Sequence, residues 1–108
     1  MEFNDYQQRA RQTAIYPQSH VIGYPALGLA GEVGEVAEHV KKMYRDDNGI
    51  LTPERRAELK KEVGDVLWYI ASLCHDIELT MNEVAEANLA KLESRKERGT
   101  LHGSGSDR

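Results

Sequence analysis

Residues 59–77 read LKKEVGDVLWYIASLCHDI, and this stretch decides the fold. Its apolar side chains recur every three or four residues, which is the pattern of an α-helix that packs on one face. These positions are Leu59, Val63, Val66, Leu67, Ile70, Leu73 and Ile77. Thr52 and Pro53 form a typical helix start, because threonine caps free N–H groups and proline needs no hydrogen bond in the first turn. We therefore predict a helix from Thr52–Pro53 to about Ile77.

Two more helices are predicted on the N-terminal side of this one. Asn4 and Gln7 have the spacing of a capping box, which predicts a first helix from about Asp5 to Ile15. Prolines and glycines then indicate a loop over residues 16–24. The helical period resumes after Pro25, so a second helix is expected from Pro25 to about Arg45.

The C-terminal part of the chain predicts a fourth helix and a tail. Thr80 and Glu83 form a second capping box, and Gly99 is a plausible helix terminator. Residues 100–108 are rich in glycine and serine, so we expect a flexible tail. No strand pattern occurs. The sequence therefore predicts an all-α domain over residues 1–99, a small bundle of about four helices.

The third predicted helix is apolar over a wide arc. Trp68 and Tyr69 lie on either side of its main stripe and broaden it. A helix of this kind in a chain of 108 residues often buries its second face against another subunit. We therefore expect a homo-oligomer, either a dimer or a dimer of dimers.

Composition excludes several classes of protein. The chain is 40% hydrophobic and 30% charged, as expected for a globular protein, and its net charge of −4 argues against general nucleic-acid binding. No apolar run approaches the roughly 20 residues of a membrane span, and the N-terminus does not resemble a signal peptide. Cys74 has no partner for an internal disulfide. These features predict a soluble, cytoplasmic protein that has no membrane partner.

Two acidic motifs predict a metal site. Glu32 and Glu35 are three residues apart on the second predicted helix, and Glu62 and Asp65 repeat that spacing on the third. Residues at i and i+3 share a helix face, so adjacent helices would bring four carboxylates together beside the apolar stripes. Such a group repels itself unless a cation is bound, and Mg²⁺ or Mn²⁺ prefers all-oxygen ligands. A merely solvated charged face is the competing interpretation.

Glycines and histidines add weaker indications. Four glycines interrupt the interiors of the acidic helices, each at a cost of about 1 kcal/mol relative to alanine. They are Gly28, Gly31, Gly34 and Gly64. Close helix packing and close approach of a ligand explain them equally well. His39 shares the acidic side of the second helix and is a candidate outer group of the site, whereas His20 lies in the preceding loop, within possible reach of a ligand.

The fourth predicted helix carries the opposite charge. Asn88, Lys91 and Arg95 follow one another at i, i+3 and i+7, and Lys42 extends the acidic line of the second helix. Acids that hold a metal and bases that bind phosphates together are typical of a site for nucleoside polyphosphates. Ordinary surface charge among neighbouring glutamates is the alternative.

Residues 24–38, YPALGLAGEVGEVAE, and residues 62–69, EVGDVLWY, resemble the MazG-like nucleoside triphosphate pyrophosphohydrolases. The resemblance extends over residues 88–92 and 95–99 and so spans nearly the whole chain. It implies an all-α enzyme, dimeric or tetrameric, which uses Mg²⁺ to cleave nucleoside triphosphates between the α- and β-phosphates. The products would be a nucleoside monophosphate and pyrophosphate. Mn²⁺ is expected to substitute for Mg²⁺.

The resemblance also implies roles for individual residues. The metal ligands and catalytic acids would be Glu32, Glu35, Glu62 and Asp65. The contacts to substrate phosphates or sugar would come from Lys42, Asn88, Lys91 and Arg95. Some relatives have an extra glutamate directly before the first motif, where this chain has Gly31. The general base is therefore open, and one motif carboxylate is the simplest substitute.

Three other interpretations compete with this one. A phosphoribosyl-ATP pyrophosphohydrolase would have the same acidic helices. A non-catalytic helical interaction module would leave the interior glycines and the four acids unexplained. A di-iron carboxylate bundle needs Glu-x-x-His pairs, which neither acidic helix has. The sequence does not reveal the preferred base or sugar.

Overall fold

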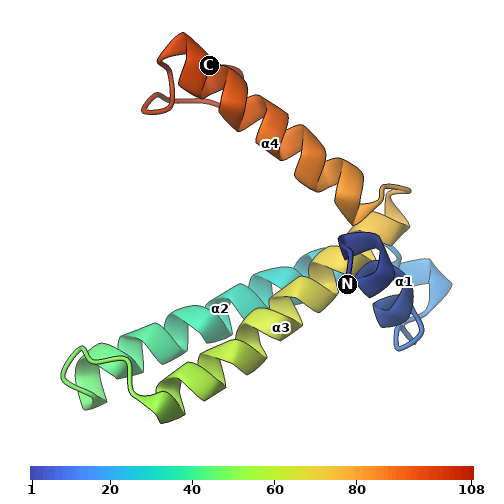
Figure 1. Ribbon diagram of the computed structural model, residues 1–108. Coiled ribbons are helices and arrows are strands. Elements are labelled where there is room, and N and C mark those ends of the chain that lie inside the picture. The colour runs from blue at the N-terminus through green and yellow to red at the C-terminus, as the bar shows by residue number, and fades with distance from the viewer.

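The computed structural model describes residues 1–108 and contains four α-helices, one short 3₁₀ helix and no strand (Figure 1). The elements are α1 (Phe3–Arg11), η1 (Gln18–His20), α2 (Gly23–Asp46), α3 (Pro53–Asp76) and α4 (Met81–Arg98). The predicted all-α fold is thus confirmed. None of the helices has the length and apolar character that crossing a membrane requires.

Helices α2 and α3 form a long antiparallel hairpin (Figure 1). The turn between them uses Asn48 and Gly49, both at positive φ, where asparagine and glycine are best tolerated. Thr52 then caps α3 as predicted, because its side-chain oxygen accepts a hydrogen bond from the Arg55 N–H at 3.1 Å. This hairpin places the two acidic motifs on neighbouring helices.

Helix α1 differs from its prediction at both ends. It begins at Phe3 and ends at Arg11, and its own capping box is formed by Glu2 and Asp5. Asn4 and Gln7 instead cap α4: Asn4 Oδ1 accepts a hydrogen bond from the Asn82 N–H at 3.0 Å, and Gln7 Oε1 accepts one from the Met81 N–H at 2.6 Å. The capping-box prediction for these two residues was therefore wrong, because the N–H groups that they satisfy belong to another helix.

The core is small and lies where α1, α3 and α4 meet. Its buried apolar residues are Ala10, Ala71, Cys74 and Met81, and the partly buried Tyr6, Leu67, Trp68 and Ile70 pack against them. Only seven of the 108 residues are buried. A single chain therefore encloses much less apolar surface than its helical stripes offer.

Helix α4 projects away from the α2–α3 hairpin instead of lying along it (Figure 1). Large apolar side chains consequently remain exposed on all three of the long helices. They include Leu27, Val33, Val63, Leu89 and Leu92. The four predicted helices are present, but one chain does not close them into a bundle.

The residues after α4 fold back along its C-terminal end. Gly99 has φ 72°, the left-handed conformation that ends many helices. The guanidinium of Arg95 donates a hydrogen bond to the carbonyl of Ser106, and Arg98 Nη2 donates one to the carbonyl of Arg108 at 2.8 Å. These contacts bury Arg95, whose residue exposure is 5%.

Candidate functional site

Three acidic side chains meet in the middle of the α2–α3 hairpin. Glu32 comes from α2, and Glu62 and Asp65 come from α3. One carboxylate oxygen from each residue lies within 4.8 Å of the others. We call these three residues the acidic cluster. The i, i+3 spacing on α3 and the antiparallel packing against α2 account for their convergence.

The electrostatics of Glu32 reflect this crowding. Its pKa is raised above the ordinary glutamate value, first by desolvation, then by the negative charge of Asp65 and by a hydrogen bond to Glu62. A raised carboxyl pKa means that the folded protein disfavours the full negative charge of the site. A bound cation would remove this repulsion, and the all-oxygen donor set suits Mg²⁺ or Mn²⁺.

Two predicted residues of α2 lie outside the acidic cluster. Glu35 is exposed, and its carboxylate is not among the three that converge. Its charge nevertheless contributes to the raised pKa of Glu32, so the two carboxylates are near each other. Lys42 lies ten residues after Glu32, about 15 Å farther along the axis of α2. Lys42 is nevertheless only one helical turn beyond His39, whose ring lies 3.5 Å from Glu62.

A chain of polar contacts reaches the acidic cluster from the hairpin turn. Arg55 Nε lies 3.0 Å from Asp47 Oδ2, and Arg55 Nη1 lies 3.2 Å from His39 Nδ1. His39 Nε2 in turn lies 3.5 Å from Glu62 Oε1. Sequence reasoning named His39 as an outer group but missed Arg55 and Asp47. The spacing offered a clue, because Arg55 precedes Glu62 by seven residues and therefore lies two turns away on the same side of α3.

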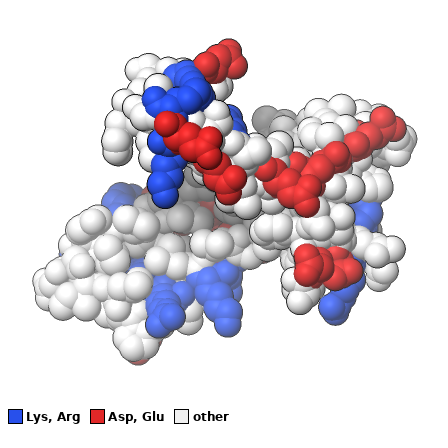
Figure 2. Space-filling model, turned by 45° about the horizontal axis from the view of Figure 1, so that its top comes forward, with Lys and Arg blue, Asp and Glu red and all other residues white.

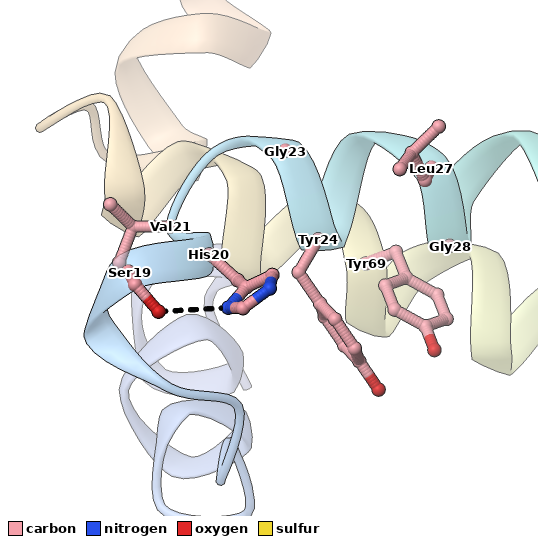
Figure 3. A pocket seen from close by; sticks show the side chains of 8 residues that line it. All are labelled: Ser19, His20, Val21, Gly23, Tyr24, Leu27, Gly28 and Tyr69. Carbon is pink, nitrogen blue, oxygen red and sulfur yellow. Dashed lines mark hydrogen bonds between the residues drawn. The ribbon is translucent and has the colours of Figure 1, made fainter.

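An open cavity of about 570 Å³ lies at the start of α2 (Figure 3). Tyr24, Leu27 and Gly28 of α2 line it together with Tyr69 of α3 and His20 of η1. Gly28 is required here, since a Cβ at residue 28 would lie 2.6 Å from Tyr69 Cδ1 and closer still to two other ring atoms. Tyr69 is also close enough to Glu32 for that charge to help raise the tyrosine pKa, after desolvation and Tyr24. The cavity thus adjoins the acidic cluster.

Asp76 holds the loop that forms one wall of this cavity. Its carboxylate accepts hydrogen bonds from the Tyr16 hydroxyl at 2.8 Å, from the Ile22 N–H at 2.8 Å and from Arg11 Nη1 at 3.3 Å. The Asp76 side chain is only 1% exposed. Ile22 has φ 69°, a conformation that is unfavourable for a β-branched residue. Asp76 therefore offsets local backbone strain and keeps Tyr16 stacked on Tyr24, with 4.8 Å between the ring centroids.

The predicted phosphate contacts of α4 lie apart from the acids. Asn88 lines an apolar cavity beside α3, Lys91 is exposed, and Arg95 is buried beneath the C-terminal residues. Because α4 projects away from the hairpin (Figure 1), one chain does not bring these residues to the acidic cluster. On the face that Figure 2 shows, the basic side chains lie in separate groups among acidic and uncharged ones.

Residues 25–100 match the family model described as the MazG nucleotide pyrophosphohydrolase domain. The chain belongs to this family. The matched range contains the acidic cluster, Glu35 and all the polar residues singled out on α4. MazG proteins are generally dependent on a divalent metal, which agrees with a cluster of three carboxylates.

One curated relative matches this MazG family member from end to end. It is the "Gene 37 protein" of Mycobacterium phage L5, which is 43% identical over 114 residues, with all of both chains covered. Its name states no activity. No solved structure matches the chain significantly.

Proposed function

We propose that this protein hydrolyses nucleoside or deoxynucleoside triphosphates between the α- and β-phosphates. The products would be a nucleoside monophosphate and pyrophosphate. The role would be to control nucleotide concentrations or to remove damaged or non-standard nucleotides. The observation that carries the proposal is the convergence of Glu32, Glu62 and Asp65 within a MazG domain. Hydrolysis of a phosphoanhydride depends mainly on positioning and on stabilisation of charge, which a cluster of this kind can provide through a cation.

The acidic cluster fits a magnesium ion by the chemistry of its donors. Its three carboxylates provide only oxygen ligands, and Mg²⁺ commonly keeps several waters besides a few carboxylates. Glu35 is the proposed fourth acid, because its exposed side chain is free to turn toward Glu32 one helical turn away. When bound, Mg²⁺ would supply positive charge to the substrate phosphates and acidity to the attacking water.

The protein residues would divide the remaining tasks. A motif carboxylate that is not fully engaged as a ligand would accept the proton of the attacking water. The nucleoside would enter the cavity beside the cluster, where Tyr24 and Tyr69 present aromatic rings to a base. Asp76 would keep that wall in place through Tyr16 and the Ile22 backbone.

The departing diphosphate would be held by α4 of a neighbouring subunit in a homo-oligomer. The exposed apolar side chains of α2, α3 and α4 support such an assembly, since a chain with seven buried residues has little core of its own. Within it, Lys91 would act as a point charge and Asn88 as a hydrogen-bond donor. Arg95 would bind phosphate only after it leaves the Ser106 carbonyl. Lys42 lies one helical turn beyond His39 on α2 and would contact the substrate from the hairpin.

The test is a panel of ribo- and deoxyribonucleoside triphosphates and phosphoribosyl-ATP, assayed with Mg²⁺ in ¹⁸O-labelled water. Products are resolved by mass. Monophosphate and pyrophosphate should appear in equal amounts from the preferred nucleoside triphosphate. Nucleoside diphosphate and orthophosphate as first products would overturn the reaction class. Turnover of phosphoribosyl-ATP alone would reassign the substrate.

A further inference from the structure

Glu62 differs from the other two acids of the cluster in what surrounds it. It alone contacts a basic side chain, the imidazole of His39 at 3.5 Å. Glu32 and Asp65 form no such contact with a basic side chain. The orientation of Glu62 is therefore influenced by a basic group outside the cluster, whereas Glu32 and Asp65 have no basic partner of this kind.

The contact with Arg55 determines which nitrogen of His39 faces Glu62 as a donor. A guanidinium group only donates hydrogen bonds, so His39 Nδ1 must accept from Arg55 Nη1 across 3.2 Å. We therefore assign the ring hydrogen to Nε2, the atom that lies 3.5 Å from Glu62 Oε1. Arg55 thus fixes both the tautomer and the plane of the ring.

Arg55 is itself fixed at two points. Its Nε donates to Asp47 Oδ2 at 3.0 Å, and its backbone N–H donates to the Thr52 cap at 3.1 Å. Asp47 follows directly after α2, and Thr52 caps α3. The contacts from Asp47 through Arg55 and His39 to Glu62 therefore tie both ends of the hairpin turn to the acidic cluster.

This chain of contacts is shielded from solvent compared with the other ion pairs of the hairpin. The side chains of His39, Arg55, Asp47 and Glu62 are 16%, 16%, 18% and 19% exposed. In the nearby pair of Lys41 and Glu38, the corresponding values are 58% and 47%. Exposed pairs contribute little because water and salt screen them, whereas shielded pairs retain more of their attraction.

We propose that Arg55 and His39 are positioning residues, which hold the Glu62 carboxylate in the geometry that the divalent cation requires. Carboxylates that bind metals commonly need contacts with outer polar groups to fix their direction. Asp47 balances the charge of Arg55, so that Arg55 acts on the ring of His39 without placing an uncompensated cation near the site. The inference rests on the proposed function, because it assumes that the acidic cluster binds a metal.

The experiment measures Mn²⁺ affinity of the full chain by isothermal titration calorimetry, without nucleotide. His39→Asn shortens the side chain and removes the contact with Glu62, and Arg55→Gln removes the charge that orients the ring. Each should weaken Mn²⁺ binding about 10- to 100-fold. His39→Gln places an amide nitrogen near the position of Nε2, so it should retain Mn²⁺ affinity within about threefold of the unmodified protein.

Matched controls come from exposed neighbours on α3. Arg56→Gln and His75→Asn make the same chemical changes at residues that lie outside the contact chain, and both should bind Mn²⁺ normally. Circular dichroism without metal checks that all variants remain helical. Weak binding by His39→Asn and rescue by His39→Gln would support positioning, since a general loss of packing would not be repaired selectively.

Glu62→Gln separates the two hypotheses. If it loses Mn²⁺ binding while His39→Asn and Arg55→Gln bind normally, the positioning role is wrong and the metal site stands. If Glu62→Gln itself binds Mn²⁺ normally, the metal site is wrong, and the positioning role falls with it. Equal weakening by His39→Asn and His39→Gln would also overturn the role of the Nε2 contact.

Discussion

The α2–α3 hairpin carries the acids of the candidate site, helix α4 carries its candidate cations, and the two regions are organised in different ways. The hairpin assembles Glu32, Glu62 and Asp65 within one chain. Helix α4 carries Lys91 and Arg95 on an arm that leaves the hairpin (Figure 1). Acid geometry therefore depends on the local pairing of two helices, whereas the geometry of the cations depends on what packs against α4. We expect changes in the hairpin to affect metal binding, and changes in α4 to affect phosphate binding and assembly.

The largest effect is expected from the acids of the hairpin. Asp65→Asn removes a negative ligand at nearly constant size and should lower turnover at least about 100-fold while the helices remain intact. Glu35→Gln should have a similar effect if Glu35 completes the metal site. Steady-state kinetics and circular dichroism provide the measurements. Near-normal turnover of Asp65→Asn would contradict the site, whereas near-normal turnover of Glu35→Gln alone would reduce it to the three converging acids.

The next effect concerns assembly through the apolar side of α4. Leu89 is 57% exposed in one chain, so Leu89→Glu should be harmless to an isolated protomer. In an oligomer that buries this face, the new charge should shift the protein toward monomer and lower turnover by about tenfold or more. Sedimentation velocity at low micromolar concentration detects the change. Ala90→Glu, at the next exposed position of α4, tests whether added charge alone has the same effect.

An active monomer would contradict this interpretation directly. If the unmodified protein sediments as a monomer at the concentration at which it is fully active, the cations of α4 cannot reach the acids from another subunit. Helix α4 would then have to move toward the hairpin of its own chain for its cations to reach the acids.

A smaller effect is expected from a cation of α4. Lys91→Ala should lower kcat/KM for a nucleoside triphosphate about tenfold, because a hydrogen bond to a charged group contributes at least about 1.5 kcal/mol. Its Mn²⁺ affinity should stay unchanged, unlike that of Asp65→Asn. Lys96→Ala, another exposed lysine of the same helix, is the control. A silent Lys91→Ala would place the phosphate contacts elsewhere.

The sequence predicted best those features that depend on neighbouring residues. The helices follow from apolar periodicity, and the Thr52 cap lies where its spacing placed it. Glu62 and Asp65 converge because i and i+3 share a face of one helix, and Glu32 joins them once α2 packs beside α3. Glu35 obeys the same spacing, yet it remains outside the cluster, because helical spacing fixes the Cβ direction and leaves the side-chain rotamer free.

Contacts between distant residues could not be predicted in the same way. The spacing of Asn4 and Gln7 is that of a capping box, but it contains no information on which helix receives the cap. Arg55 and His39 lie on different helices, and only their packed positions make them partners. The direction of α4 was missed for a related reason: its apolar stripe predicts that it packs, but not whether the partner belongs to the same chain.

The smallest effect concerns the join between α1 and α4. The first three N–H groups of α4 are all satisfied, by Gln7 for Met81, by Asn4 for Asn82 and by Thr80 for Glu83. Loss of such a cap typically costs about 1 kcal/mol, so Asn4→Ala should lower the free energy of unfolding by about that amount. Gln7→Ala should cost more, because Gln7 Nε2 also donates to the Leu79 carbonyl at 2.9 Å.

Urea denaturation at one fixed protein concentration measures both changes, with the exposed Gln8→Ala as the control. These caps belong to α4 and not to the hairpin, so both variants should bind Mn²⁺ with unchanged affinity. The corresponding change in the hairpin, Thr52→Ala, removes the cap next to Arg55 and should weaken Mn²⁺ binding through His39 if the contact chain positions Glu62. If loss of the α4 caps and loss of the α3 cap weakened Mn²⁺ binding equally, the hairpin and α4 would be energetically coupled. Metal binding would then not depend on the hairpin alone.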